Sequence, residues 1–139
     1  MTQAFVADAS ISIGWVHPAQ ATDASAAWLS VVEAGALLVV PSLWSLEVAN
    51  ALVVLTRRGK LTQEERKSAL EKLGCLPDEV DAEGPRLAFT SLEALADEHS
   101  LSVYDAVYLE LAIRRKLPLA CKDGPLNAAA KKCRVKLTP

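Results

Sequence analysis

Aromatic residues are scarce in this chain, at 5% of 139 positions, so we expect a core built from aliphatic side chains. No run approaches the ~20 consecutive apolar residues that a bilayer-spanning helix requires. The N-terminus also shows no basic segment followed by an apolar one, as a secretory signal would. We therefore expect a cytoplasmic protein without membrane segments. Hydrophobic residues still make up 51%, which excludes a disordered chain and predicts a single domain over residues 1–139.

Cysteine and histidine are also few, with three and two residues respectively. Cys75, Cys121 and Cys133 form no Cys-x-x-Cys pair and have no histidine at metal-ligand spacing, so we expect reduced thiols and no zinc site. His17 has no acid near it in the sequence, and His99 ends a polar helical segment. We interpret both histidines as surface or packing residues, because a general base needs a positioned partner in a cleft.

The net charge is −2, which argues against a globally basic nucleic-acid-binding surface. Charge is nevertheless uneven along the chain. Lysine and arginine dominate residues 114–136, where Asp123 is the single acid, whereas acids dominate residues 78–98, where Arg86 is the single base. The basic stretch could bind a phosphate backbone, or it could be an ordinary solvated helix end, where cations are favoured.

Short aliphatic runs alternate with amphipathic segments along the chain. The runs at 4–7, 36–40 and 117–121 predict buried strands, and weaker patterns at 79–81 and 135–137 predict two more. The intervening segments predict helices at 10–17, 22–35, 42–58, 62–74, 86–99, 102–116 and 124–132, with Thr22, Ser42 and Thr62 as N-caps. Thr62 and Glu65 have the spacing of a capping box, in which each side chain bonds the backbone of the other. This alternation is typical of an α/β fold, here a three-layer α/β/α arrangement around a mainly parallel sheet of four to five short strands.

Four acids interrupt apolar surroundings. Asp8 and Asp123 each follow a predicted strand, and Asp105 lies three residues after Ser102. Each of these three could simply cap or favour a helix N-terminus. Glu47 has no such explanation, because it lies beyond the first turn of its helix among aliphatic neighbours. A buried carboxylate is costly unless a cation, a hydrogen-bond donor or solvent stabilises it.

The topology relates these acids to one another. In a parallel sheet, residues that follow strands or begin the next helices can collect at the carboxyl edge, where ligand sites form. Asp105 also shares its helix face with Tyr108 and Leu109, so it should point inward. Clustered carboxylates repel by roughly 3 kcal/mol per pair at ~5 Å. A hard divalent cation would relieve this repulsion, and such a site suits phosphodiester hydrolysis.

Four segments of the chain match a known pattern in their order and spacing: 5–10 (FVADAS), 41–50 (PSLWSLEVAN), 103–112 (VYDAVYLELA) and 117–123 (LPLACKD). With them the chain resembles the PIN-domain endoribonucleases, and in size and layout the VapC-type toxins of toxin–antitoxin pairs. The resemblance implies a PIN-like fold that cuts RNA and leaves a 3′-hydroxyl and a 5′-phosphate. It implies one or two Mg²⁺ or Mn²⁺ ions bound by Asp8, Glu47, Asp105 and Asp123.

The resemblance has further implications. Ser10 and Asn50 match positions that orient the acids and bound waters. Cys121 departs from the family, which usually has Thr or Ser there, and a thiol donates hydrogen bonds more weakly than a hydroxyl. The family also implies an antitoxin partner and a homodimer. The apolar helical hairpin at 43–74 agrees with such an interface, and the three tryptophans could contribute to it or could pack in the core, the role we expect for at least two of them.

Two other functions deserve comparison. A module of the same fold with an impaired site could bind a protein partner or RNA without cutting it, and Cys121 is the feature that favours this alternative. An aspartyl-phosphate phosphotransferase or receiver domain also places an acid after a strand. That pattern fails here, because Ser10 stands where a dehalogenase-like enzyme needs a second Asp, and a receiver needs a paired acid and a Lys at strand ends. No motif in the chain names a particular RNA.

Overall fold

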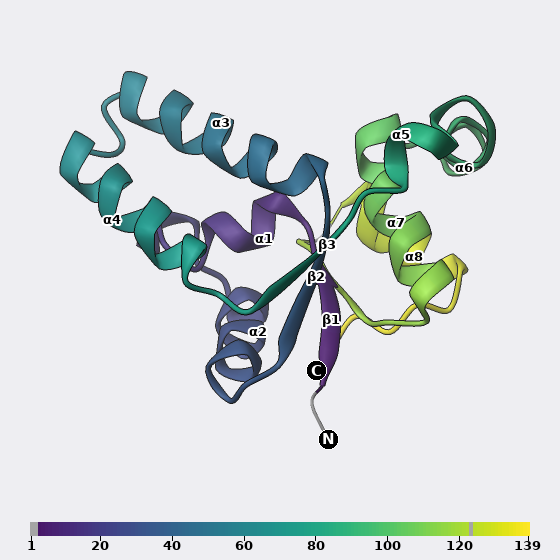
Figure 1. The fold of residues 1–139 in the computed structure, drawn as a ribbon, viewed down its shortest axis with the longest axis horizontal. Coiled ribbons are helices and arrows are strands. Elements are labelled where there is room, and N and C mark those ends of the chain that lie inside the picture. Colours follow the sequence, from purple (N-terminus) through teal and green to yellow (C-terminus); the bar gives the residue numbers. More distant parts are fainter. Residues whose placement is uncertain (1–2, 123) are drawn as a thin grey trace.

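Four parallel strands form the centre of the computed structural model, which describes residues 3–122 and 124–139 (Figure 1). They are β1 (Ala4–Ala7), β2 (Leu37–Pro41), β3 (Asp78–Asp81) and β4 (Leu119–Ala120), in the order β3-β2-β1-β4. Val6 of β1 pairs with a residue on each neighbouring strand, Val39 on β2 and Leu119 on β4. The predicted α/β class and parallel sheet are therefore confirmed.

The predicted strand at 135–137 is wrong. A single hydrogen bond, from the Leu119 N–H to the Lys136 carbonyl (2.8 Å), joins this segment to β4, so no ladder forms. The chain enters the segment through Arg134 in the left-handed region (φ 59°), which is not a strand conformation. Among the described residues the sheet thus has four strands.

Helices cover both faces of the sheet, which confirms the three layers. Figure 1 shows two groups of helices, one on each side of the sheet. The first group comprises α1 (Ala9–Ile13), α2 (Asp23–Glu33), α3 (Leu43–Arg57) and α4 (Gln63–Gly74), with a 3₁₀ turn at Pro18–Gln20. The second comprises α5 (Gly84–Leu87), α6 (Glu93–His99), α7 (Val103–Arg115) and α8 (Pro125–Lys132). None of the helices in the described part of the chain is both long and apolar enough to cross a membrane.

Local helix signals were reliable where they involve short-range side-chain bonds. Thr22 and Thr62 both cap their helices, and Thr62 forms the predicted reciprocal pair with Glu65 (3.0 and 2.9 Å). Ser42 is not a cap, because its backbone is already helical and its N–H continues the β2–β3 ladder by bonding the Asp81 carbonyl (3.0 Å). Ser42 thus stands at the predicted start of α3 but makes no side-chain capping bond.

Two predicted helices have different extents in the structure. The helix expected over 10–17 ends at Ile13, and Gly14 then packs so closely on α2 that an added Cβ would lie 3.0 Å from Ser25. The helix expected over 86–99 is interrupted by a π-helical turn at Ala88–Leu92. Within that turn the Thr90 hydroxyl donates to the Leu87 carbonyl (3.4 Å), a local bond of the kind that competes with regular helix geometry.

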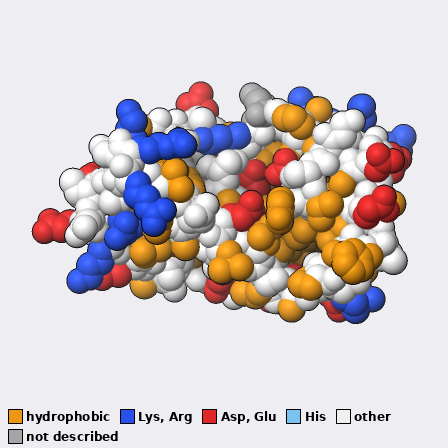
Figure 2. All heavy atoms as spheres, turned by 90° about the horizontal axis from the view of Figure 1, so that it is seen from above, with side chains coloured by type: hydrophobic (Ala, Val, Ile, Leu, Met, Phe, Trp, Pro, Cys, Tyr) orange, Lys and Arg blue, Asp and Glu red, His pale blue; other side chains and the backbone are white. Residues whose placement is uncertain are grey.

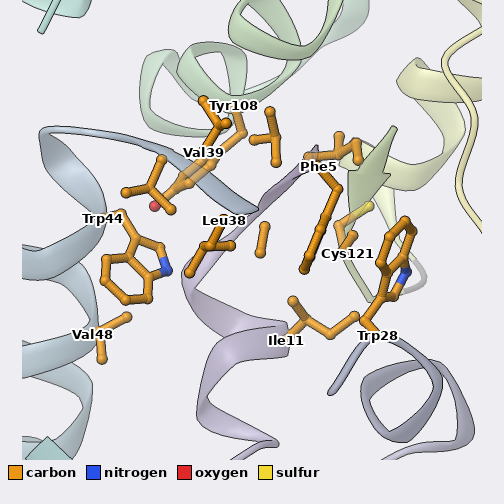
Figure 3. Packing of buried hydrophobic residues seen from close by; sticks show 14 of the residues in the cluster. Phe5, Ile11, Trp28, Leu38, Val39, Trp44, Val48, Tyr108 and Cys121 are labelled. Carbon is orange, nitrogen blue, oxygen red and sulfur yellow. The ribbon is translucent and has the colours of Figure 1, made fainter. Parts of the chain in front are cut away.

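The core is aliphatic around a small aromatic group, as the composition predicts (Figure 3). Phe5 on β1 stacks on Trp28 of α2, with ring centroids 4.4 Å apart, and meets Trp15 edge-on. Trp44 is also buried and donates its indole N–H to the Ser12 hydroxyl (2.9 Å). All three tryptophans thus belong to the core, and none is available to form the exposed surface of the helical hairpin.

The basic stretch predicted from the sequence is partly neutralised by the acidic one. Arg114 on α7 makes two 2.9 Å bonds to the Asp81 carboxylate at the end of β3, and its Nε pairs with Glu110. Arg115 pairs with Glu79 of β3 at 2.6 Å. These pairs join α7 to the edge strand, and the Arg114 guanidinium lowers the pKa of Asp81. The two arginines therefore have a structural role.

The histidines are packing residues. His17 is buried, which agrees with a packing role and not with the surface role that was the other expectation. His99 is less exposed than its polar sequence neighbours suggested, with 11% of its side chain accessible, and its Nε2 lies 3.5 Å from the Cys133 sulfur. Burial raises the pKa of the Cys133 thiol, the opposite of the shift that activates a cysteine nucleophile.

Candidate functional site

Three of the predicted acids line one pocket of about 420 Å³ at the carboxyl edge of the sheet. Asp8 follows β1 directly, Glu47 lies on α3 after β2, and Asp105 lies in the first turn of α7. Figure 2 looks onto this edge and shows acidic side chains gathered near the middle of the face, with apolar side chains beside them. Asp123, the fourth predicted acid, lies outside the described residues, although Lys122 and Gly124 line the same pocket.

Asp8 is both a helix cap and a pocket residue. Its Oδ1 accepts the Ile11 N–H (2.9 Å), which caps α1, and the Ser10 hydroxyl lies 2.9 and 2.8 Å from the two carboxylate oxygens. Only 8% of Asp8 is exposed. Burial, with smaller contributions from the negative charges of Asp105 and Glu47, raises its pKa to about 6 despite these bonds. The capping interpretation of Asp8 is therefore confirmed, and its role as a metal ligand stays a prediction.

Glu47 is held by a tyrosine hydroxyl. Tyr108 on α7 donates to Glu47 Oε1 at 2.5 Å, across 61 positions of sequence. The phenol is 1% exposed. Burial is the main cause that raises the pKa of Tyr108, and the bond to Glu47 is the next. The hydroxyl therefore keeps its proton and remains a donor. This bond provides the donor that a carboxylate among aliphatic neighbours requires.

Tyr108 also lines the pocket, and sequence reasoning treated it only as part of an apolar helix face. The available signal was its chemistry, because a tyrosine on a buried face must find a hydrogen-bond partner for its hydroxyl. Its position three residues after Asp105 places both on one side of α7. Those two facts together identify Tyr108 as a site residue.

Asp105 does not use its carboxylate to cap α7. The Ser102 hydroxyl accepts the Asp105 N–H (3.0 Å), so Ser102 is the cap and it bonds the backbone of Asp105. The side chain is half-buried and lines the pocket. Burial raises the pKa of this carboxyl group. The inward orientation predicted from the helix face thus agrees with the structure.

The residues expected to support the acids differ in their placement. Ser10 bonds Asp8, as described above. Asn50 is exposed on α3, and it is absent from the described lining of the pocket. Cys121 follows β4 and packs in the core on the same side of the sheet as Phe5 and Trp28 (Figure 3). The structure therefore brings Ser10 to the acids and leaves Asn50 and Cys121 outside that lining.

The chemistry of the pocket fits a hard cation. Its acids offer carboxylate oxygens, the ligands that hard divalent cations prefer, and the neighbouring charges of Asp105 and Glu47 contribute to the raised pKa of Asp8. Within residues 3–122 and 124–139, no group of three or more His, Cys, Asp or Glu side chains is arranged so that it could hold a metal ion. The described acids thus form an open, oxygen-lined pocket and not a preformed cage.

Comparison with known proteins identifies the family. No protein-family model matches the chain. The chain is 32% identical over 98 residues to Ribonuclease VapC1 of two Mycobacterium tuberculosis strains, CDC 1551 / Oshkosh and ATCC 25618 / H37Rv, covering 70% of this chain and 71% of each relative. The crystal structure of PAE2754 from Pyrobaculum aerophilum superimposes with a TM-score of 0.66 at 23% identity, over 92% of this chain and 79% of that one, and so shares the fold.

The fold and the position of the acidic pocket thus define a PIN-like α/β domain. Within that class, the chain belongs to the VapC family.

Proposed function

We propose that this protein is a Mg²⁺- or Mn²⁺-dependent endoribonuclease and the toxin of a toxin–antitoxin pair. The observation that supports the proposal most directly is the convergence of Asp8, Glu47 and Asp105 from three separate elements on one pocket. Membership of a family whose curated relatives are named ribonucleases supports RNA as the substrate.

The three acids, together with Asp123, are the residues that would hold one or two ions. A bound Mg²⁺ or Mn²⁺ supplies charge to neutralise a phosphate and lowers the pKa of a water for in-line attack. Carboxylates with raised pKa values bind such a cation in competition with protons, so the site should be most effective above about pH 6.

The chain's own residues prepare the acids for this role. Ser10 and the Ile11 N–H fix the orientation of the Asp8 carboxylate, and Tyr108 fixes that of Glu47. Because these donors belong to α1 and α7, the relative positions of the acids are set by the packing of the helices on the sheet. Such fixed geometry lowers the cost of ordering the acids around a substrate phosphate.

An antitoxin and a second copy of the chain remain proposed partners. Large apolar side chains are exposed on the helices on both sides of the pocket: Leu46 on α3 at 69%, Phe89 at 97% in the π-helical turn, and Tyr104 on α7 at 62%. Exposed apolar groups of this size are characteristic of interaction surfaces. The tryptophans, being buried, do not contribute.

The proposal is tested by RNA cleavage in Mn²⁺ or Mg²⁺, with EDTA as the metal-free condition. Asp105→Asn should reduce cleavage by about 100-fold or more, because it removes a charged oxygen donor and keeps the shape. Asp97→Asn, which alters an exposed acid of α6, is the matched control and should cleave like the wild type. Equal cleavage by Asp105→Asn would refute the assignment of the site.

The alternative is a binding module of the same fold that does not cut RNA. The cysteine at position 121, where the family usually has a hydroxyl, is the observation that favours it. A folded wild-type protein that binds RNA or a protein partner, yet leaves a mixed pool of single-stranded and structured RNAs intact in Mn²⁺, would establish this alternative and refute the enzyme.

A further inference from the structure

Among the described residues, Lys122 is the cation that lines the acidic pocket. It lies two residues beyond the end of β4, is half-buried, and donates from Nζ to the Gln20 side-chain oxygen at 3.0 Å. Gln20 ends the 3₁₀ turn between α1 and α2, 102 positions away in the sequence. Among the residues that the structure describes, Lys122 forms no ion pair with an acid.

The bond to Gln20 orients the ammonium group without neutralising it. A glutamine amide oxygen accepts one of the three ammonium protons and carries no net charge, so two donors and the full positive charge remain. A lysine held in this way is suited to an anion that enters the pocket from outside. A phosphate oxygen is such an anion.

The order of the sheet places this charge at a defined end of the pocket. Asp8 follows the central strand β1, Glu47 lies on the helix after β2 on one side, and Lys122 follows β4 on the other side. A polyanionic strand that places one phosphate at the acids would therefore find a cation on the β4 side.

The other cations of the basic stretch are absent from the described lining of this pocket. Arg114 and Arg115 pair with acids of β3. Lys116, Arg134 and Lys136 line a separate cavity of about 370 Å³. This cavity includes Pro118, which directly precedes β4, so these cations lie at the opposite edge of the sheet. Lys122 is thus the member of that stretch which the fold brings to the acids.

We propose that Lys122, oriented by Gln20, binds a phosphate oxygen of the RNA strand at the β4 end of the acidic pocket. This inference rests on the proposed function and adds a substrate-binding residue to it. Its role is to hold the strand in register with the acids.

The test measures RNA binding separately from cleavage. Asp105→Asn serves as the parent, and the dissociation constant of a short single-stranded RNA is measured at constant Mg²⁺ over a series of KCl concentrations. Adding Lys122→Ala should weaken binding about tenfold and reduce the slope of log Kd against log salt by about 0.7, the contribution of one phosphate contact in a single strand. Lys122→Arg should retain the slope, because it retains the charge.

Two further variants separate a phosphate contact from a general loss of charge or of structure. Lys136→Ala removes an equal charge at the opposite edge of the sheet and should leave both affinity and slope unchanged. Gln20→Ala keeps the charge of Lys122 but removes its anchor, so affinity should fall while the slope is retained. Circular dichroism and thermal unfolding of each variant verify that it folds.

The possible failures are distinguishable. If the wild type cleaves RNA and Lys122→Ala keeps the affinity and the slope of its parent, the inference is wrong and the proposed function stands. If the wild type neither binds nor cleaves RNA, the proposed function is wrong and this inference fails with it.

Discussion

Asp8→Asn should make the protein more stable at neutral pH, although it should abolish the activity that we propose. Asp8 is almost fully buried beside two other acids, and its pKa is about 6 in the folded protein against an ordinary value of 3.8. The folded state therefore binds the proton more tightly than the unfolded state does. Stability should fall as pH rises from about 4 to above 6, because folding then requires an ionised carboxylate in an unfavourable place.

The magnitude follows from the two pKa values. Each pH unit between them corresponds to about 1.4 kcal/mol, so ionised Asp8 costs up to about 3 kcal/mol above pH 7. Asparagine keeps the cap on α1, because Asn and Asp are comparable N-caps. It loses the extra strength of a charged acceptor for Ser10 and Ile11, so we expect a net gain of about 1 to 3 kcal/mol.

The assay is urea unfolding followed by tryptophan fluorescence, with EDTA present, at pH 8 and at pH 4.5. The advantage of Asp8→Asn over the wild type should be largest at pH 8 and should shrink by about 2 kcal/mol at pH 4.5, where the wild-type carboxyl is protonated in the folded state. Asp97→Asn is the control and should stay within about 0.5 kcal/mol of the wild type at both pH values. An Asp8→Asn protein less stable than the wild type at pH 8 would refute the reasoning.

Tyr108→Phe should lower the rate of RNA cleavage by about tenfold or more, because Glu47 loses its hydrogen-bond donor. The unfolding free energy should fall by only about 1 kcal/mol, since the ring still packs in the core. An unchanged cleavage rate would mean that the hydroxyl does not position Glu47. Cleavage at subsaturating Mn²⁺ should decline as pH falls through about 6, where protons compete for Asp8, and a flat profile from pH 7.5 to 5 would contradict this. Arg114→Met should lower the unfolding free energy by about 1 to 2 kcal/mol in urea titrations, because Asp81 loses a bidentate partner. RNA cleavage should stay intact, and a loss of cleavage with unchanged stability would contradict the structural role of Arg114.

Sequence reasoning succeeded where the relevant interaction is local or where an anomaly demanded a partner. The Thr62–Glu65 pair spans three residues, so both halves of the cap are visible in the sequence. Glu47 was recognised as a carboxylate that needs a donor, but the donor is Tyr108, 61 positions away, and no local pattern specifies that pairing. The acids and the Ser10 partner of Asp8 could therefore be named from the sequence, whereas the donor to Glu47 required the fold.

The failures have a common physical origin in tertiary competition. Ser42 has the composition of a cap, yet its backbone is helical where β2 pairs with β3, and its side chain makes no capping bond. The basic stretch suggested a phosphate-binding face, yet the fold pairs Arg114 and Arg115 with acids of β3 and brings Lys122 alone of that stretch to the pocket. Charge counts along a chain do not reveal which charges neutralise one another.

The most direct test of the central claim is Mn²⁺ binding to the folded protein, measured by isothermal titration calorimetry near pH 7.5. Asp8, Glu47 and Asp105 should give the wild type one or two sites that saturate below millimolar Mn²⁺, and Asp105→Asn should weaken this binding by about tenfold or more while Asp97→Asn leaves it unchanged. A folded wild-type protein that binds no Mn²⁺ at millimolar concentration would contradict the account.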